Sequence, residues 1–363
     1  MQAVTARCAG ATVGDLAALT ERLRPSAHQA ELERRWPAQA LQAYGEFGGW
    51  RLAVPAVYGG LESPAEYRLS VYMALARADM SAALFITQHE GATDLVCCSE
   101  NNALRSRWAP KFASGQSLTT IGYSQLTTSR PGGKPALRAA AVAEGFLLDG
   151  LMPWVTGAPF TETVACGAQL AGGTQILVLL PLAREGVLIK PAETLAALNS
   201  TYTCEVHCEQ VIVRNEELIA GPVHNVLAAR STLRLLLVSA TGCGLAEGML
   251  DEVQRLAERG SEDARTVLDV ATQRNTDLRR RLLALAAQAA PPQSAIDALR
   301  GQLNDWLVRL AGIVMTCAKG SGYKETSTAQ RLAREAQFFC VWSASPPVRA
   351  NTLSHLLGTV IFS

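Results

Sequence analysis

The sequence predicts an α+β protein with an N-terminal helical domain, a central small β-barrel domain and a C-terminal four-helix bundle. Two observations predict this order. Apolar residues recur every three to four positions up to residue 117, alternate with a period of two over residues 118–217, and then return to helical spacing. Turn-forming residues also divide the middle part into short segments. We therefore expect domains at residues 1–117, 118–217 and 218–363.

Composition narrows the class of protein. The chain has 363 residues, of which 48% are hydrophobic and 18% charged, which allows more than one core and excludes general disorder. A formal net charge of +1 predicts no nucleic-acid partner. No apolar run is long enough to predict a membrane span. Nine cysteines without framework spacing, and no signal peptide, predict reduced thiols and a cytoplasmic protein.

One cysteine-rich segment resembles a metal site at first sight. Cys204, His207 and Cys208 lie within TYTCEVHCEQVIV (201–213), which has the pattern of a strand. Alternation places the two cysteines on one face and the histidine on the other, and a second ligand pair is missing. The sequence therefore predicts no metal.

The N-terminal part contains helices interrupted by a loop. Residues 38–47 and 64–78 have apolar positions at helical spacing. Between them, RLAVPAVYGG (51–60) is predicted to be a loop, because Pro55 and Gly59-Gly60 break a helix.

The middle part reads as short strands rich in Val, Ile, Thr and Leu. They are predicted at residues 118–123, 136–143, 145–148, 152–156, 163–169, 174–180, 187–191 and 204–213. Asp149-Gly150 lies between two apolar runs in GFLLDGLMPWVTGA (145–158), which predicts a hairpin turn. Alternation along its second strand would place Trp154 and Thr156 on one face.

The C-terminal part is helical. Helices are predicted at residues 225–259, 262–289, 294–317, 328–340 and 347–357, with Pro291-Pro292 separating two of them.

Five motifs in this order resemble those of the acyl-CoA dehydrogenase superfamily of flavoproteins. VPAVYGG (54–60) is similar to the P-x-x-[YF]-G-G loop, GYSQLTTSRPGG (122–133) to T-E-P-x-A-G-S-D, and WVTGA (154–158) to W-I-T-N/G-A. GCGLAEGMLDE (242–252) resembles the start of the long C-terminal helix, and KGSGYKETSTAQRLAREA (319–336) resembles G-G-x-G-[YF]…R-[DE]-A. The resemblance implies the same fold over most of the chain.

The resemblance also implies a flavin site. It implies that Trp154 lies near the flavin ring, that Thr156 bonds the N5 region, and that Ser124 reaches the pyrimidine edge. Fixed donors at these edges would stabilise a reduced flavin. The residues implied to bind the cofactor are Tyr123, Ser124, Gln125, Trp154, Thr156, Gly320, Gly322 and Ser345.

The motif residues that would hold the ADP part of FAD are less similar to those of the family. The family's R-x-x-F-G segment reads Arg259-Gly260-Ser261-Glu262-Asp263, which lacks the Phe and adds two acids. Lys319 replaces the first glycine of G-G-x-G, and its charge could neutralise a phosphate. FAD is the predicted cofactor, with FMN as the alternative.

The usual catalytic base is missing. The family's Glu of Y-E-G-T falls on Ser343, and a hydroxyl cannot take a proton at pH 7 without a neighbouring base. The second position known in the family reads Ser231-Thr232-Leu233-Arg234, without a carboxylate. The remaining catalytic candidates are His89 and Glu90 in the first helical domain, as a substitute acid–base pair, and Arg130, as a residue that holds an anionic group.

Three functions remain open at this point. The first is a flavin-dependent oxidoreductase that dehydrogenates an acyl thioester, on coenzyme A or a carrier protein, with a non-standard base. The second is a two-component flavin monooxygenase on the same fold, which would not need the Glu. The third is a degenerate, non-enzymatic member. The resemblance implies an electron-transfer flavoprotein or a flavin reductase as partner, and a homodimer or homotetramer.

Overall fold

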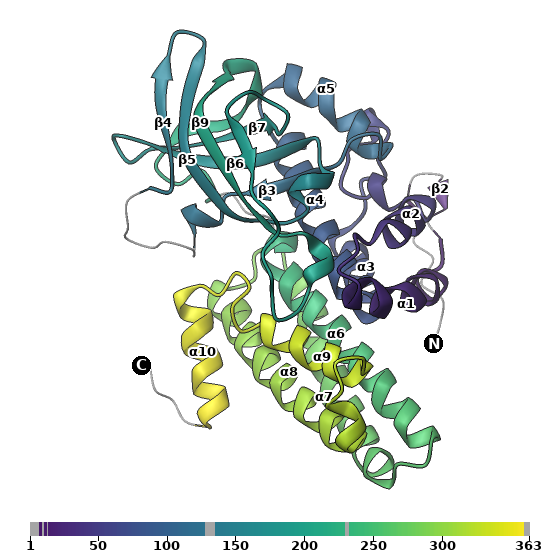
Figure 1. The fold of residues 1–363 in the computed structure, drawn as a ribbon. Helices are drawn as coiled ribbons and strands as arrows, with labels where there is room; N and C mark the ends of the chain where they lie inside the picture. Colours follow the sequence, from purple (N-terminus) through teal and green to yellow (C-terminus); the bar gives the residue numbers. More distant parts are fainter. Residues whose placement is uncertain (1–6, 9–10, 13, 128–134, 229–231, 359–363) are drawn as a thin grey trace.

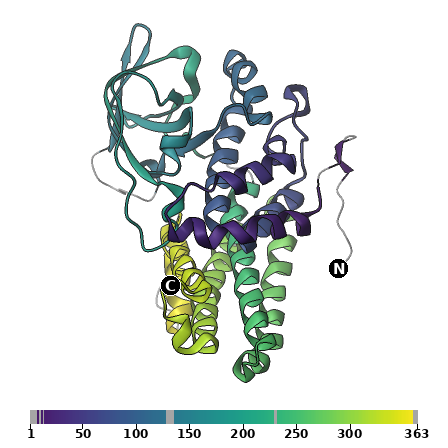
Figure 2. The ribbon, with the colours of Figure 1, turned by 45° about the vertical axis from the view of Figure 1, so that its right-hand side comes forward.

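The computed structural model describes residues 7–8, 11–12, 14–127, 135–228 and 232–358. Figure 1 shows the N-terminal helices beside a twisted sheet, with the C-terminal helices forming an elongated bundle below both. Turning the molecule shows α1 running across the upper end of the bundle (Figure 2). The predicted order of helical, β and helical parts is confirmed.

The N-terminal helices connect the other two parts. Helix α3 packs against α6 of the bundle, and α4 packs against strand β3 of the sheet. The predicted loop at residues 51–60 contains only short 3-10 turns. The described elements are β1 (Arg7–Cys8), β2 (Ala11–Thr12), α1 (Leu16–Leu32), α2 (Ala38–Glu46), η1 (Gly49–Arg51), η2 (Ala56–Tyr58), α3 (Ala65–Ala78), α4 (Met80–Cys97) and α5 (Asn102–Ala113).

The middle part forms one eight-stranded sheet with the order β10-β7-β6-β4-β5-β9-β8, and β3 adds to β6 in parallel. One apolar core lies within the sheet domain, and a second apolar cluster is shared between the sheet and helices α4 and α5. The elements are β3 (Thr119–Gly122), η3 (Ser124–Leu126), β4 (Leu137–Val142), β5 (Gly145–Val155), η4 (Ala158–Phe160), β6 (Thr163–Leu170), β7 (Gln175–Pro181), β8 (Val187–Ile189), η5 (Asn199–Thr201), β9 (Cys204–Arg214), η6 (Asn215–Glu217) and β10 (Leu218–Val223).

The predicted hairpin at Asp149-Gly150 is wrong. Both residues lie inside the single strand β5, and the hairpin is formed by β4 and β5, whose register ends with Val142 opposite Gly145. Gly150 has φ 129° at a shift in the pairing with β9, and a Cβ there would lie 2.1 Å from the carbonyl oxygen of Ala136. The glycine therefore serves a close approach of strands inside the sheet instead of a turn.

The C-terminal helices are α6 (Thr232–Glu258), α7 (Glu262–Ala286), α8 (Gln293–Gly322), α9 (Thr328–Phe338) and α10 (Pro346–Leu357). Helices α6 to α9 pack on one another, and α10 packs on α8. Residues Leu233–Glu258 are apolar and long enough to span a membrane by composition, but 78% of their apolar window is buried inside the protein, as in the core helix of a bundle.

The contact between α3 and α6 is made at the level of the backbone. A Cβ on Gly244 would lie 2.2 Å from the carbonyl oxygen of Met73, and one on Gly248 would lie 2.6 Å from that of Arg77. The GCGLAEG motif therefore allows the two helices to touch.

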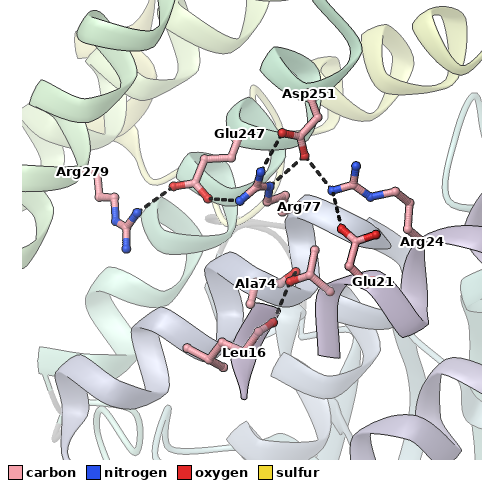
Figure 3. A network of polar contacts seen from close by, with 9 residues as sticks. Leu16, Glu21, Arg24, Ala74, Arg77, Glu247, Asp251 and Arg279 are labelled. Carbon is pink, nitrogen blue, oxygen red and sulfur yellow. Dashed lines mark hydrogen bonds and ion pairs between the residues drawn. The ribbon is translucent and has the colours of Figure 1, made fainter. Parts of the chain in front are cut away.

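Charged side chains form a network of ion pairs at the edge of this contact. Arg77 donates two hydrogen bonds of 2.7 Å to the carboxylate of Asp251, which also accepts from Arg24 of α1 at 2.7 Å. Glu247 pairs with Arg279 of α7 at 3.1 Å, so that the network joins four helices (Figure 3). Bidentate pairs of this kind fix orientation as well as adding energy.

Candidate functional site

The short turn η3 is bonded to three strands of the sheet, β5, β3 and β6. The hydroxyl of Ser124 donates to the carbonyl oxygen of Pro153 at 3.0 Å. The amide of Gln125 donates to the carbonyl oxygens of Gly122 at 3.1 Å and Gly167 at 2.7 Å. These bonds place the first flavin motif directly beside Trp154, the next residue after Pro153.

Trp154 has an unusual backbone and an accessible ring. Its φ is 60°, at a bulge between Met152 and Val155 in the pairing with β9, and it is 53% exposed. A positive φ in a bulky residue costs energy and is often found at functional sites. The indole is therefore held at the surface and not sealed in the core.

Thr156 is placed differently from Trp154. It is 6% exposed, and its hydroxyl lies 3.3 Å from that of Thr203. Its carbonyl oxygen accepts from the hydroxyl of Thr120 at 2.7 Å. The bulge interrupts the alternation on which the shared face was predicted, and the role of Thr156 at a flavin stays a prediction.

His89 is a buried, uncharged side chain. The Nδ1 of His89 lies 3.1 Å from the backbone nitrogen of Thr119 and 3.3 Å from its carbonyl oxygen. The rings of Trp50 and Phe112 flank it at centroid distances of 5.0 and 5.8 Å. Burial lowers the pKa of His89 to about 4, because the charged form is poorly solvated there. Its part in catalysis stays a prediction.

Glu90 lies at the centre of a buried polar cluster. Its carboxylate accepts hydrogen bonds from the hydroxyls of Tyr44 and Tyr72, and from Arg68 at 2.8 Å. Arg68 also bonds both oxygens of Asp94, at 3.1 and 3.0 Å. These contacts engage both oxygens of Glu90 within the N-terminal domain, which gives the residue a structural role whether or not it also serves catalysis.

Ser343 lies in an exposed turn between α9 and α10, where its φ is 48°. The turn is braced by the buried Arg300 of α8, which donates to the carbonyl oxygens of Phe339 at 2.9 Å and Trp342 at 3.1 Å. Burial lowers the pKa of Arg300 to about 9. The N–H of Ser345 then bonds the carbonyl oxygen of Ser343 at 3.1 Å, where α10 begins.

Two of the residues that the sequence singled out, Arg130 and Ser231, lie outside the described residues. Arg234, at the second position where the family can carry a base, donates to the hydroxyl of Tyr123 at 2.7 Å. Sequence reasoning recorded the missing carboxylate there but missed the contact between this cation and the η3 segment.

A second set of predicted residues lies at the far end of the bundle. Lys319 forms a kink in α8 with φ 54° and ψ −151°, and it pairs with Asp263 at 3.7 Å across two exposed side chains. Gly320 faces open space, whereas a Cβ on Gly322 would lie 2.7 Å from that of Ala318.

A pocket opens beside this kink, between the end of α6 and the start of α9. Three basic side chains and one acid line it, with hydroxyls around them, and the acid, Glu252, pairs with Arg255. Its lining residues are Glu252, Arg255, Leu256, Arg259, Ala318, Ser321, Lys324, Thr326, Ser327 and Thr328. Cationic side chains and a helix N-terminus are a donor set that suits phosphates.

No cluster of three or more His, Cys, Asp or Glu side chains suited to a metal occurs within the described ranges. Cys204 and Cys208 are buried in β9, and the imidazole of His207 bonds Glu205.

Comparison with known protein families matches residues 16–116 to the acyl-CoA dehydrogenase, N-terminal domain. A (2S)-methylsuccinyl-CoA dehydrogenase of Cereibacter sphaeroides is 27% identical over 150 residues, which are 41% of this chain and 27% of that protein. A protein named probable acyl-CoA dehydrogenase fadE25, of Mycobacterium leprae, is 24% identical over 241 residues, which are 64% of this chain and 62% of that protein. The matched region thus spans less than two thirds of either relative.

Solved structures extend the likeness to nearly the whole chain. Butyryl-CoA dehydrogenase from Megasphaera elsdenii superposes with a TM-score of 0.82 at 14% identity, covering 94% of this chain and 95% of that one. KijD3, in complex with FMN and an amino-keto-sugar nucleotide, has a TM-score of 0.77 at 18% identity, covering 94% and 92%. At these identities the likeness shows the fold, and the fold predicted from the sequence is confirmed.

Proposed function

We propose, from the premise that this chain is a divergent member of the acyl-CoA dehydrogenase superfamily, that it is a flavin-dependent oxidoreductase acting on an acyl thioester. A bound flavin would supply the two-electron redox chemistry. The chain's own residues would hold the ring, keep water away from it and orient the substrate.

The bond from Ser124 to the carbonyl of Pro153 carries this proposal. It brings together two motif segments that the sequence separates by 30 residues, beside an exposed indole held by a strained backbone. The buried Oε1 of Gln125 also finds no donor among the described residues, and the pyrimidine edge of a flavin carries an N–H that needs an acceptor. These observations fit a flavin ring held by Tyr123, Ser124, Gln125 and Trp154.

The basic pocket supports FAD over FMN. Arg255, Arg259 and Lys324 would balance a pyrophosphate, while Gly320 leaves room for close approach. This pocket lies on the bundle and not beside η3. The flavin ring and the ADP part of one cofactor would therefore be bound by different subunits of an oligomer. A homodimer or homotetramer is therefore part of the proposal, as are the electron-transfer flavoprotein or flavin reductase partner and the cytoplasmic location.

The reaction we put first is α,β-dehydrogenation of the thioester, on coenzyme A or a carrier protein, as the names of the matched relatives suggest. It requires a base in place of Ser343. The second candidate is a flavin monooxygenase, which two observations favour. Ser343 is a hydroxyl in an exposed turn, and the carboxylate of Glu90 is engaged by Tyr44, Tyr72 and Arg68.

Spectroscopy of the purified protein tests these proposals. A flavin band that bleaches on adding an acyl-CoA under nitrogen supports dehydrogenation. Bleaching that requires NAD(P)H and a reductase, followed by oxygen-dependent recovery with substrate conversion, supports the monooxygenase. A colourless protein that cannot be loaded with FAD or FMN contradicts both and leaves the non-enzymatic alternative.

Ser343→Glu tests the position of the missing base. If the site is a dehydrogenase without its usual acid, this variant should create or raise acyl-CoA-dependent dye reduction, because a carboxylate can accept the α-proton. Val341→Glu is the matched control, since it adds the same charge to an exposed position of the same turn. No gain in a flavin-loaded Ser343→Glu protein, or an equal gain in both variants, counts against this geometry.

A further inference from the structure

The connection between β8 and β9 reaches helix α1, where one carboxylate holds it. Glu31 of α1 accepts hydrogen bonds from the backbone N–H groups of Asn199 at 3.1 Å and Ser200 at 3.2 Å. It also accepts from the side chains of the same two residues, at 3.2 and 3.1 Å. Because Glu31 is only 6% exposed, these bonds join the sheet to the N-terminal helices inside the protein.

The bonded segment, residues 198–203, has a strained backbone on both sides of these bonds. Leu198 has φ 64° and Tyr202 has φ 47°, in the left-handed region that residues other than glycine seldom adopt. Such conformations persist where the surrounding contacts enforce them. The segment should therefore relax when its bonds to Glu31 weaken.

Glu31 belongs to a group of three buried acids from different parts of the molecule. Asp79 lies between α3 and α4, where it caps α4 by accepting from the N–H of Ala82 at 3.0 Å. Glu335 comes from α9 of the bundle. Glu31 and Asp79 both disfavour the charged form of Glu335, and Arg331 of α9 is the cation that opposes them.

Glu335 is the member of this group that has the fewest donors. It accepts one hydrogen bond, from Arg331 at 3.0 Å, and its Oε2 has no partner among the described residues. Burial and the two neighbouring acids raise its pKa to about 7. When its proton leaves, a further negative charge arises beside Glu31 in a buried site, where charges repel strongly.

A histidine of α1 lies at the same junction. His28 is near Arg331 and Arg334 of α9 and Glu252 of α6, and its Nε2 lies 2.9 Å from the carbonyl oxygen of Thr326. Burial lowers the pKa of His28, and the two arginines add to this effect. Its imidazole is therefore uncharged near neutral pH and supplies no second cation for the three acids.

We propose that Glu31 and Glu335 form a pH-dependent latch, which holds segment 198–203 against α1 while Glu335 is protonated and releases the segment when that proton is lost. The closed latch binds the proton more tightly than the open one, so closure is favoured at low pH and weakens as the pH rises toward 7. No flavin or substrate takes part, and the inference does not rest on the proposed function. Release would reach the predicted ring site, because the hydroxyl of Thr203 bonds that of Thr156.

Hydrogen exchange measures the latch directly, because the N–H groups of Asn199 and Ser200 are themselves bonded to Glu31. Exchange of the full chain is followed from pH 5 to 8 by mass spectrometry that resolves single amides, and each rate is divided by its intrinsic rate at that pH. The protection of these two amides should fall by about 10- to 100-fold over this range. Amides of β6 should stay at least tenfold better protected at every pH, because the segment opens without unfolding of the protein.

Two variants test the assignment of the proton. Glu335→Gln keeps the size of the side chain without its charge, so the protection of Asn199 and Ser200 should change less than threefold over the same range. Glu325→Gln is the matched control, since Glu325 is an exposed acid just before α9 and its loss should leave the wild-type dependence unchanged. Asp79→Asn keeps a capping residue and removes a neighbouring charge, which should move the midpoint of the fall to lower pH.

Protection of the two amides that does not change with pH in the wild type would overturn the inference, and so would an equal fall in Glu335→Gln. Equal protection of the segment and of β6 would show that the whole protein unfolds and that no latch opens. If Glu335→Gln does not fold, Asp79→Asn decides the question, because an unmoved midpoint would contradict the repulsion on which the latch depends.

Discussion

Glu90 of α4 and Glu335 of α9 are each 1% exposed, yet their carboxylates meet different neighbours. Glu90 accepts from two tyrosine hydroxyls and from Arg68. Desolvation, together with the charge of Glu90, raises the pKa of Tyr44 well above its ordinary value, so that this hydroxyl remains a donor. Burial thus does not leave the Glu90 carboxylate short of partners.

Glu335 accepts one hydrogen bond, from Arg331 at 3.0 Å, and its Oε2 is buried without a partner among the described residues. Burial raises the pKa of Glu335 to about 7, the nearby acids Glu31 and Asp79 add to the effect, and Arg331 opposes it. The comparison teaches that two equally buried acids can differ in the number of donors around them, and that Glu335, which has few, favours its uncharged form.

The largest expected effect comes from removing the cation of the well-satisfied cluster. Arg68→Met leaves Glu90 and Asp94 without their charged partner in a buried site, which should cost about 3–5 kcal/mol of unfolding free energy. Urea unfolding at pH 6 measures the loss. Arg331→Met should cost less at the same pH, because Glu335 can take up a proton. Equal losses in the two variants would contradict the comparison.

The pH dependence of Glu335 should be nearly as large. Its pKa is about 7 in the folded protein and 4.5 for the ordinary side chain, so the folded state holds a proton that the unfolded state loses between these values. Stability should therefore fall as the pH rises through this window, by about 3 kcal/mol in total. Denaturation of wild type and Glu335→Gln at pH 5, 6, 7 and 8 checks this. The variant should show a flatter profile, and parallel profiles would refute the assignment.

A smaller effect is expected from one hydroxyl of the Glu90 cluster. Tyr72→Phe removes a hydrogen bond to a buried carboxylate and should cost about 1–3 kcal/mol. The same measurement on Tyr323→Phe provides the reference, since Tyr323 is highly exposed and its loss should change little. A Tyr72→Phe protein as stable as the reference would mean that Glu90 is adequately held by its other two donors.

The smallest effect is expected at the surface. Arg138 of β4 pairs with Asp149 of β5, and both side chains are exposed. Arg138→Met should leave the unfolding free energy within about 0.5 kcal/mol of wild type, since water and salt screen such pairs. A larger loss would show that removing a charged partner matters as much at the exposed surface as in the interior.

The sequence predicted the helical, β and helical order because apolar spacing reports burial directly. The prediction failed at Asp149-Gly150. Asp-Gly is a common hairpin turn, but here the glycine allows two strands to approach closely inside the sheet. It placed Glu90 among candidate bases because Tyr44 and Arg68 are distant in the chain, and spacing cannot reveal that they converge on it.

The candidate site was predicted in part. The two segments expected to hold the flavin ring were recognised as motifs, and the bond from Ser124 to Pro153 joins them in the structure. The bulge that turns Trp154 outward depends on the pairing of β5 with β9, which no local pattern encodes. The contact of Arg234 with Tyr123 was missed because the two residues belong to different parts of the fold.

The bare contact of Gly244 and Gly248 with the backbone of α3 bears on how the molecule can adapt. At these two points no side chain separates α3 from α6, so a side chain at either glycine would force the two helices apart. Since α6 also carries Arg234, such a displacement would move its guanidinium relative to Tyr123. The spacing of these two helices therefore bears on the geometry beside the η3 turn.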